Sequence, residues 1–281
     1  MTILVTGANG TVSGAVLRSL PTKDDVRVLV RDPGKAPPGY EVAVGDLDDP
    51  ATLGEAFADV DTLWLLTAMG PQAPHASMNA VWAAREAGVR HVVRLSAIGA
   101  AHDAPTRNGR LHALSDAELQ ASGLNWTIIR PAFFMQNLFG ALNGSTLYGA
   151  TGHGRLGLID VRDIGDFAAE LLTNPRPHTG KVYTLTGPAS ISLDEAAADL
   201  EAVYGRPVTY QPLSPDQVHA AMLDAGVPEW IAAVSVEYAV AYARGWGDYT
   251  TPDFAAVTGR APRSFLDFAR AHAEHLASTP S

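Results

Sequence analysis

Short apolar runs alternate with helix-length segments through the first half of the chain. The runs that we expect to form strands are residues 3–5, 26–30, 42–44, 63–66, 91–95 and 126–129. The segments that we expect to form helices between them are 11–20, 50–58, 76–88 and 110–122. Apolar strands separated by helices are typical of βαβ units, in which helices cover both faces of a parallel sheet. The pattern therefore predicts an α/β fold with a Rossmann-like, doubly wound parallel sheet.

The pattern changes after Pro131. Residues 140–157 are rich in glycine and small polar residues, which is typical of a loop. The elements expected after this loop are a strand at 158–161, a helix at 163–172, a strand at 182–185, and mainly helices from Ser192 to a last helix at 264–276. We therefore predict a Rossmann domain over residues 1–186, with 131–157 contributing to a substrate pocket, and a smaller, mostly helical substrate-covering lobe over 187–281.

Composition argues against several classes of protein. The chain has 281 residues and no cysteine, which excludes disulfides, thiolate metal sites and cysteine nucleophiles. Its net charge of −10, from 30 acidic residues against 20 Lys and Arg, disfavours nucleic-acid binding, which needs clustered positive charge. No apolar stretch approaches the roughly 20 residues of a membrane span, and the N-terminal segment has the character of a strand, not of a signal peptide. We expect a cytoplasmic protein with neither a nucleic-acid nor a membrane partner.

Two other kinds of site are disfavoured by the sequence. His272 and His275 are spaced by three on the last expected helix, but no third ligand accompanies them. They are therefore expected to lie on a solvated face, and no metal site is predicted. Ser96 lacks the Gly-x-Ser-x-Gly turn of α/β-hydrolases, which argues against a serine hydrolase.

A glycine-rich turn joins the first strand to the first helix. Gly7 permits a sharp exit from the strand, and Gly10 lets backbone N–H groups approach a pyrophosphate at the positive end of the helix dipole. Ser13 stands where a third small residue usually allows the helix to pack closely on the strand. A turn of this kind between a strand and a helix predicts a dinucleotide site. The residues of the turn that we expect to contact the cofactor are Gly7, Asn9, Gly10, Thr11 and Val12.

The end of the second strand favours NADPH over NADH. An acidic residue there would bind the ribose 2′-hydroxyl of NAD, whereas a cation binds the 2′-phosphate of NADP. Here Arg31 comes first beyond the strand, Lys35 can reach the same phosphate, and the side chain of Asp32 is expected to point away from Arg31. Ligands of such folds lie beyond the carboxyl ends of the strands. Further cofactor contacts are therefore expected at Asp46, Leu47, Thr67, Ala68, Met69, Ser96 and Ala97.

The chain resembles the NmrA-like branch of the atypical short-chain dehydrogenases/reductases. The resemblance rests on the segments above and on residues 129–138, 159–164, 183–188 and 258–263. The likeness covers nearly the whole chain. The quinone oxidoreductases and triphenylmethane reductases of this family look like the closest functional relatives. The resemblance implies hydride transfer from NAD(P)H to a conjugated acceptor.

The chain departs from the wider superfamily where a catalytic acid is expected. Short-chain dehydrogenases commonly use a Tyr-x-x-x-Lys pair, and the corresponding places, counted back from Ser122, hold Asn108 and His112. Loss of a general acid costs ketone reduction roughly 10²–10⁴ in rate, because the product alkoxide is strongly basic. Quinone reduction yields a phenolate, whose conjugate acid has a pKa of about 10 by analogy with tyrosine, and so needs less help. The sequence therefore favours an electron-poor, conjugated acceptor, such as a quinone or a related aromatic or polyketide-like carbonyl compound.

His112 is the candidate catalytic residue. It could donate a proton directly or through water, or it could face the cofactor ribose or solvent. The expected substrate pocket combines aromatic walls with amides that suit a flat, conjugated small molecule. Its residues are Ile98, Asn108, Phe133, Phe134 and Asn137, with Met135 beside them.

The sequence leaves open a second function, a non-catalytic NADP(H)-binding sensor that binds regulatory proteins. The missing Tyr–Lys pair fits such a sensor as well as it fits a reductase, and the aromatic segment favours the enzyme. A monomer and a homodimer are both compatible with the sequence.

Overall fold

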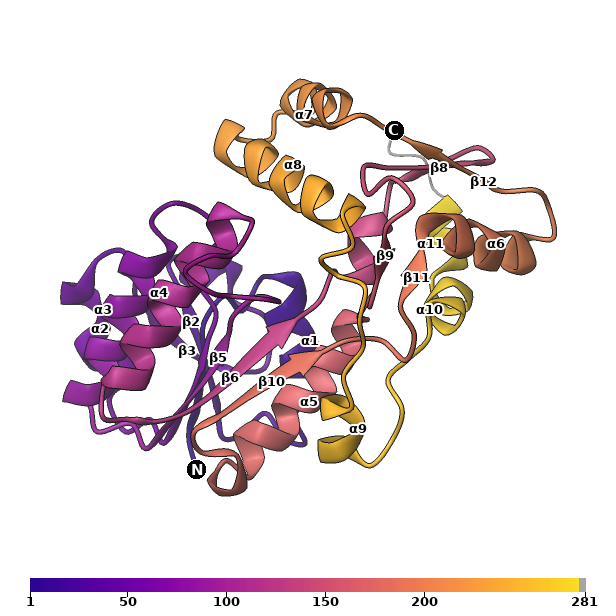
Figure 1. The fold of residues 1–281 in the computed structure, drawn as a ribbon. Helices are drawn as coiled ribbons and strands as arrows, with labels where there is room; N and C mark the ends of the chain where they lie inside the picture. Colours follow the sequence, from indigo (N-terminus) through magenta and orange to yellow (C-terminus); the bar gives the residue numbers. More distant parts are fainter. Residues whose placement is uncertain (278–281) are drawn as a thin grey trace. The chain divides into compact units, whose positions relative to one another are not determined.

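A seven-stranded sheet is formed by strands from residues 3–185 (Figure 1). The computed structural model describes residues 1–277. The strands lie in the spatial order β10 (Lys181–Leu185), β6 (Asn125–Pro131), β5 (His91–Leu95), β4 (Thr62–Leu65), β1 (Ile3–Val5), β2 (Val26–Val30) and β3 (Glu41–Val44). Every pairing from β3 across to β6 is parallel. Because the strand order reverses at β1, the predicted doubly wound sheet is confirmed.

Helices cover both faces of this sheet, which explains why its strands are apolar runs and do not alternate apolar with polar residues. Figure 1 shows α2 (Leu53–Phe57), α3 (Ala73–Glu86) and α4 (Arg107–Ala121) on one side, and α1 (Thr11–Ser19) and α5 (Val161–Thr173) on the other. The largest buried side chains of the strands and of α2 lie in the layers between these helices and the sheet.

α1 and α5 pack backbone against backbone at Gly165. A Cβ atom on this residue would lie 2.7 Å from both the carbonyl carbon and the oxygen of Ala15. The Ser19 hydroxyl of α1 also donates a hydrogen bond to the Asp166 carboxylate of α5, at 2.7 Å. The position of α1, which begins at the glycine-rich turn, therefore depends on the absence of a side chain at residue 165.

The chain folds into two compact units, each built from separated segments. The first unit contains Met1–Ala104, Asn108–Arg130 and Ile164–Thr184, and the second contains Pro105–Arg107, Pro131–Asp163 and the chain from Leu185 onward. The predicted boundary at 186/187 lies near the last of these crossings. The segment from Pro131 to Asp163, however, which we assigned to the Rossmann domain, belongs with the second unit.

The second unit contains short strands as well as helices. Its helices are the short 3-10 helix η3 (Met135–Leu138), α6 (Leu193–Tyr204), α7 (Pro215–Asp224), α8 (Glu229–Ala243), α9 (Asp253–Thr258), α10 (Phe265–Ala271) and α11 (Ala273–Ala277). Its strands form a three-stranded sheet, β12 (Thr209–Pro212), β8 (Thr146–Gly149) and β7 (Leu142–Asn143), and a pair, β11 (Ile191–Ser192) and β9 (Arg155–Leu156). The core of this unit is made of side chains from these helices and strands, among them Leu147, Leu200 and Phe268.

Three predictions for this region are wrong. The expected loop at 140–157 holds β7, β8 and β9, because β8 finds a parallel partner in β12, about 60 residues later. The expected strand at 158–161 is reduced to a single bridge between Ile159 and Phe134, since α5 already begins at Val161. The expected last helix breaks at His272 into α10 and α11.

The prediction that His272 and His275 lie on a solvated face is only partly correct. The ring of Phe139 makes edge contacts with the rings of His272 and His275, at centroid distances of 5.4 Å and 4.5 Å. His275 remains exposed, whereas His272 is half-buried. The two histidines, three positions apart, therefore pack against the same aromatic side chain, that of Phe139.

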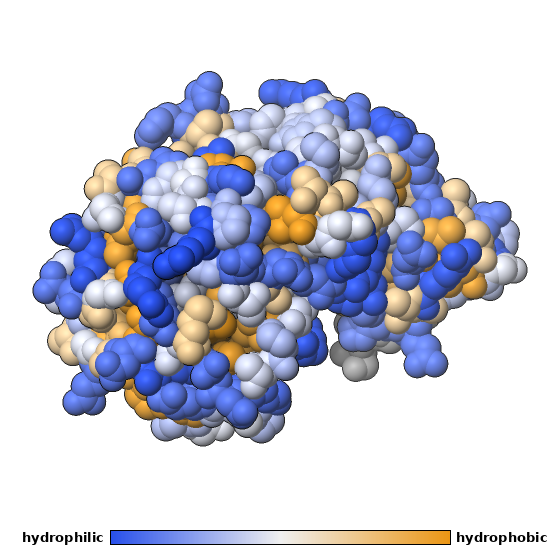
Figure 2. All heavy atoms as spheres, turned by 90° about the horizontal axis from the view of Figure 1, so that it is seen from below, coloured by the Kyte–Doolittle hydropathy of each residue, from blue (hydrophilic) through white to orange (hydrophobic). Residues whose placement is uncertain are grey.

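Hydrophobic side chains on the surface occur in separate groups. On the face drawn in Figure 2 they are interspersed with polar side chains. The large hydrophobic residues with the greatest exposed fractions are Val44 (54%), Trp82 (53%) and Leu114 (51%), and they stand on three different elements. Within residues 1–277, no helix combines the length and the apolar character that a membrane span requires.

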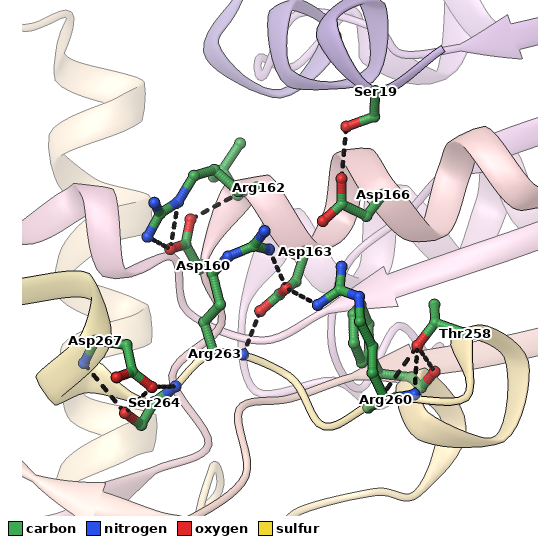
Figure 3. A network of polar contacts seen from close by, with 12 residues as sticks. Ser19, Asp160, Arg162, Asp163, Asp166, Thr258, Arg260, Arg263, Ser264 and Asp267 are labelled. Atoms are coloured by element: carbon green, nitrogen blue, oxygen red, sulfur yellow. Dashed lines mark hydrogen bonds and ion pairs between the residues drawn. The ribbon is translucent and has the colours of Figure 1, made fainter. Parts of the chain in front are cut away.

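A buried carboxylate joins two of the segments on which the family resemblance rests. Asp163, which is fully buried, accepts a hydrogen bond from the backbone N–H of Arg263 at 2.7 Å and ion-pairs with the guanidinium groups of Arg260 and Arg263 (Figure 3). Its neighbour Asp160 accepts a hydrogen bond from the backbone N–H of Arg162 (2.9 Å) at the start of α5. The segment 258–263 is thus fixed to the N-terminus of α5 within the second unit.

Candidate dinucleotide-binding and active site

The glycine-rich turn has the backbone geometry that the sequence predicts. Gly7 has a φ of +64°, a left-handed conformation that disfavours a side chain, and a Cβ there would lie 2.9 Å from Cδ2 of Leu66. The N–H of Gly10 donates to the Gly7 carbonyl at 2.8 Å and closes the turn. Gly10 is the N-cap of α1, and with no side chain it leaves the first-turn N–H groups of the helix for an anion.

The hydroxyl of Ser13 is a structural element of the turn that the sequence pattern did not predict. It donates to the Thr6 carbonyl and accepts from Nε1 of Trp64, both at 2.9 Å. The hydroxyl of Thr6 in turn donates to the Leu66 carbonyl and accepts from the Leu66 N–H, both at 2.8 Å. These bonds join the carboxyl ends of β1 and β4 to the start of α1. The sequence indicates Ser13 only as a small residue. In the structure the buried indole N–H of Trp64, on a neighbouring strand, needs the Ser13 hydroxyl as its hydrogen-bond acceptor.

A cleft of about 510 Å³ opens beside the end of β2. Arg31 lines it together with Asp46 and Thr52, so two of the sequence-predicted segments come together there. The carboxylate of Asp32 is turned away to accept from the Gly34 N–H (2.9 Å), as expected. Lys35, in contrast, is highly exposed, and its ammonium lies 3.8 Å from Asp32. Arg31 is therefore better placed than Lys35 to meet a phosphate in this cleft.

The remaining expected cofactor contacts follow β3, β4 and β5. Leu47 packs against the core, and its carbonyl accepts from the amide of Asn79 at 2.8 Å. Thr67 is half-buried and Met69 is 44% exposed, beyond the end of β4. Ser96 is buried beyond the end of β5. The parallel sheet places these residues at the same edge as the glycine-rich turn, and their contact with a cofactor stays a prediction.

A buried ionic network lies where the Tyr–Lys pair of the superfamily would be expected. Asp116 of α4 accepts from Nη1 of Arg94 (2.5 Å), from Oγ of Ser96 (2.9 Å) and from Nη2 of Arg130 (2.9 Å). The side chains of Arg94 and Asp116 are only 2% and 3% exposed. Nη2 of Arg94 also lies 3.3 Å from Nδ1 of His112, which precedes Asp116 by one helical turn. This network connects β5, β6 and α4.

Arg94, Asp116 and Arg130 are not among the site residues predicted from the sequence, although the sequence carries a signal for them. Arg94 interrupts the apolar strand His-Val-Val-Arg-Leu of β5, and charged residues inside such strands need a buried partner. Asp116 follows Asn108 and His112 at intervals of four on α4, so all three share one face of the helix. These two patterns together would have predicted the ion pair.

Burial and two guanidinium groups keep the imidazole of His112 neutral. Burial of the ring contributes most, and repulsion by Arg94 and Arg130 adds to it, so the pKa of His112 falls from 6.5 to about 3. At pH 7 the residue holds no imidazolium proton. The structure therefore gives His112 the character of a neutral hydrogen-bonding group, and its catalytic role stays a prediction.

The predicted substrate residues belong to both units. Ile98 and Asn108 are buried in the first unit. Phe133 and Phe134 are half-buried in the second unit, where Asn137 is exposed. Phe133 packs edge-on against Tyr242, at a centroid distance of 5.9 Å. Within their own units, Phe133 and Asn137 each leave side-chain surface accessible, and their contact with a substrate stays a prediction.

The residues around the turn fit a nicotinamide dinucleotide. A Cβ on Gly10 would stand 3.2 Å from the Gly7 carbonyl, so the two glycines form a close-fitting cradle of backbone groups. The start of α1 supplies N–H donors for a diphosphate, and Arg31 supplies positive charge in the neighbouring cleft. Fold and turn together define a dinucleotide-binding protein.

Comparison with known proteins identifies the family. The chain belongs to the NAD(P)H-binding family, whose model matches residues 7–175. NAD(P)H azoreductase of Xenophilus azovorans is 39% identical over 284 residues, which cover 96% of this chain and 98% of the relative. The structure is similar to NADPH-dependent quinone oxidoreductase of Escherichia coli complexed with NADPH (TM-score 0.87, 27% identity, 97% and 100% of the two chains) and to Citrobacter sp. triphenylmethane reductase complexed with NADP(H) (0.85, 25%, 96% and 100%). The expected resemblance to NmrA-like reductases is thereby confirmed, and the chain is an NAD(P)H-dependent oxidoreductase.

Proposed function

We propose that this protein is an NADPH-dependent reductase of electron-poor, conjugated small molecules, such as quinones, azo compounds and related aromatic or polyketide-like carbonyl compounds. The observation that carries the proposal is the neutral His112 beside Arg94, at the place where a Tyr–Lys pair would otherwise supply a proton. An acceptor whose reduced form spreads its negative charge over a conjugated system needs little proton transfer during reduction. The names of the azoreductase and the quinone oxidoreductase relatives support this class of acceptor.

Each part of the site has its own task in this reaction. When bound, NADPH supplies a hydride. The backbone N–H groups at the start of α1, beside the Gly7–Gly10 turn, bind its diphosphate, and Arg31 binds its 2′-phosphate.

A panel of acceptors tests the function. Purified protein is mixed with NADPH and, in separate reactions, a naphthoquinone, an aromatic azo dye or an aliphatic ketone, and kcat/KM is measured from the loss of NADPH absorbance. We expect the quinone to react at least about 100-fold faster than the ketone, because the phenolate that it forms is far less basic than an alkoxide and needs less help from a general acid. Equal turnover of the ketone would contradict the proposal. Tight NADPH binding without turnover of any acceptor would favour the non-catalytic sensor.

Arg31 is proposed to select NADPH. Replacement of Arg31 by alanine is expected to weaken NADPH binding by about 10-fold or more, because a charge-assisted hydrogen bond contributes roughly 1.5–3 kcal/mol, and to leave NADH binding nearly unchanged. Titration calorimetry with both cofactors measures the two affinities. Arg18→Ala is the control, since it removes the same charge from the exposed last turn of α1. Equal loss of NADPH affinity in the two variants would refute a specific role for Arg31.

A further inference from the structure

The Asp116 carboxylate determines which way the hydroxyl of Ser96 is turned. A carboxylate can only accept hydrogen bonds, so the 2.9 Å contact between Oγ of Ser96 and Oδ2 of Asp116 uses the hydroxyl hydrogen. Arg130 donates to the same carboxylate oxygen and Arg94 to the other one. Ser96 is left with its oxygen lone pairs, and toward any other group it is a hydrogen-bond acceptor.

Arg94 determines the tautomer of His112 in the same way. A guanidinium group has donors and no acceptor, so Nδ1 of His112 must accept from Nη2 of Arg94 across 3.3 Å. The proton of the neutral ring is then carried by Nε2. The charged groups around the ring are Arg94 from β5, Arg130 from β6, and, one turn along α4, Asp116. Both guanidinium groups oppose a second proton on the imidazole.

We propose that Arg94 and Asp116 are positioning residues that fix the hydrogen-bonding polarity of the site, that is, which of its groups donate and which accept. His112 is then an Nε2–H donor to the substrate that is reduced, and Ser96 is a hydrogen-bond acceptor. This inference rests on the proposed function for the identity of the partner of His112. Its structural half, the tautomer and the charge of His112, is independent of any substrate.

The chemistry balances without proton transfer from the protein. Hydride transfer to one carbonyl oxygen of a quinone forms its O–H bond. As the ring becomes aromatic, both C=O π bonds are lost, and the electron pair stays on the other oxygen of the hydroquinone monoanion. The oxygen that takes up the electron pair accepts the Nε2–H of His112 as a hydrogen bond, which stabilises the charge as it develops. One proton from solvent then completes the hydroquinone, and His112 keeps its own proton throughout. Such a site supports reduction only of acceptors that hold negative charge well, which is the class proposed above.

Nuclear magnetic resonance of the ¹⁵N-histidine-labelled protein tests the structural half without any ligand. The signals of His112 are assigned by their loss in His112→Gln. We expect the neutral Nε2–H tautomer and no change of the ring ¹⁵N shifts from pH 8 down to pH 5, because the pKa of about 3 lies well below this range. An Nδ1–H tautomer, or a titration within this range, would overturn the positioning by Arg94.

Two substitutions of His112 test the catalytic half. Glutamine keeps an N–H donor, and leucine removes it while retaining much of the volume. With a naphthoquinone and saturating NADPH, we expect His112→Leu to lower kcat by about 100-fold, with a smaller change in KM. His112→Gln is expected to stay within about 10-fold of the unmodified protein. Equal kcat values for the two variants would refute the donor role.

The outcomes separate this inference from the proposed function. If the unmodified protein reduces no acceptor of the panel while His112 shows the expected tautomer, the proposed function fails and the polarity of the site stands. If quinones are reduced but His112 titrates near neutrality, the function stands and this inference fails. Calorimetry with NADPH on each variant verifies that the cofactor site is intact.

Discussion

Replacement of Asp116 by leucine is expected to lower the free energy of unfolding by about 3–5 kcal/mol. The carboxylate compensates two guanidinium groups, and that of Arg94 is only 2% exposed. Removal of one partner of a buried ion pair leaves the other charge out of water and uncompensated, which costs far more than the pair itself contributes. Equilibrium urea unfolding, followed by tryptophan fluorescence and circular dichroism, measures the loss.

The control for this prediction is the double variant in which Asp116→Leu is combined with Arg94→Met. Both members of the ion pair are then apolar, and Arg130, which is 24% exposed, can reach solvent. We expect the double variant to regain much of the lost stability. If Asp116→Leu alone lowers the free energy of unfolding by less than about 1 kcal/mol, the charge of Arg94 must be solvated in some other way.

Replacement of Gly165 by leucine is expected to cost about 3 kcal/mol and to weaken NADPH binding. Even the Cβ atom would collide with the backbone of Ala15, 2.7 Å away, so α1 must move together with the glycine-rich turn at its start. The matched control is Gly54→Leu in α2, where a Cβ meets no atom within 4 Å. There the loss of glycine from a helix is expected to leave stability unchanged or to raise it by up to about 1 kcal/mol. Losses of similar size in both variants would contradict the role of close helix packing.

The features that sequence reasoning predicted are local. The central strands of the sheet are mainly apolar, and the turn is marked in the sequence by Gly7 and Gly10 themselves. The end of β2 likewise predicted Arg31 as a lining residue of the adjoining cleft. In each case, the residues that determine the structure lie within a few positions of one another.

The features that it missed depend on partners far along the chain. Asp116 meets Arg94 and Ser96 only when α4 packs on β5, about 20 residues earlier. The strand β8 is four residues of ordinary composition, and its partner β12 follows after about 60 residues. Periodicity within a window could not reveal such pairings. Arg94 within an apolar strand, and the shared helix face of Asn108, His112 and Asp116, were local signs of such a long-range partner.

The salt link between Asp163 and Arg263 has a consequence for biosynthesis. The two residues are 100 positions apart in the sequence, and ribosomes add about 5–20 residues per second. Asp163 is therefore synthesised roughly 5–20 s before Arg263. During this interval the Asp163 carboxylate must stay hydrated, so the start of α5 cannot yet be buried as it is in the folded protein. The final surroundings of Asp163 can thus form only after most of the polypeptide has been translated.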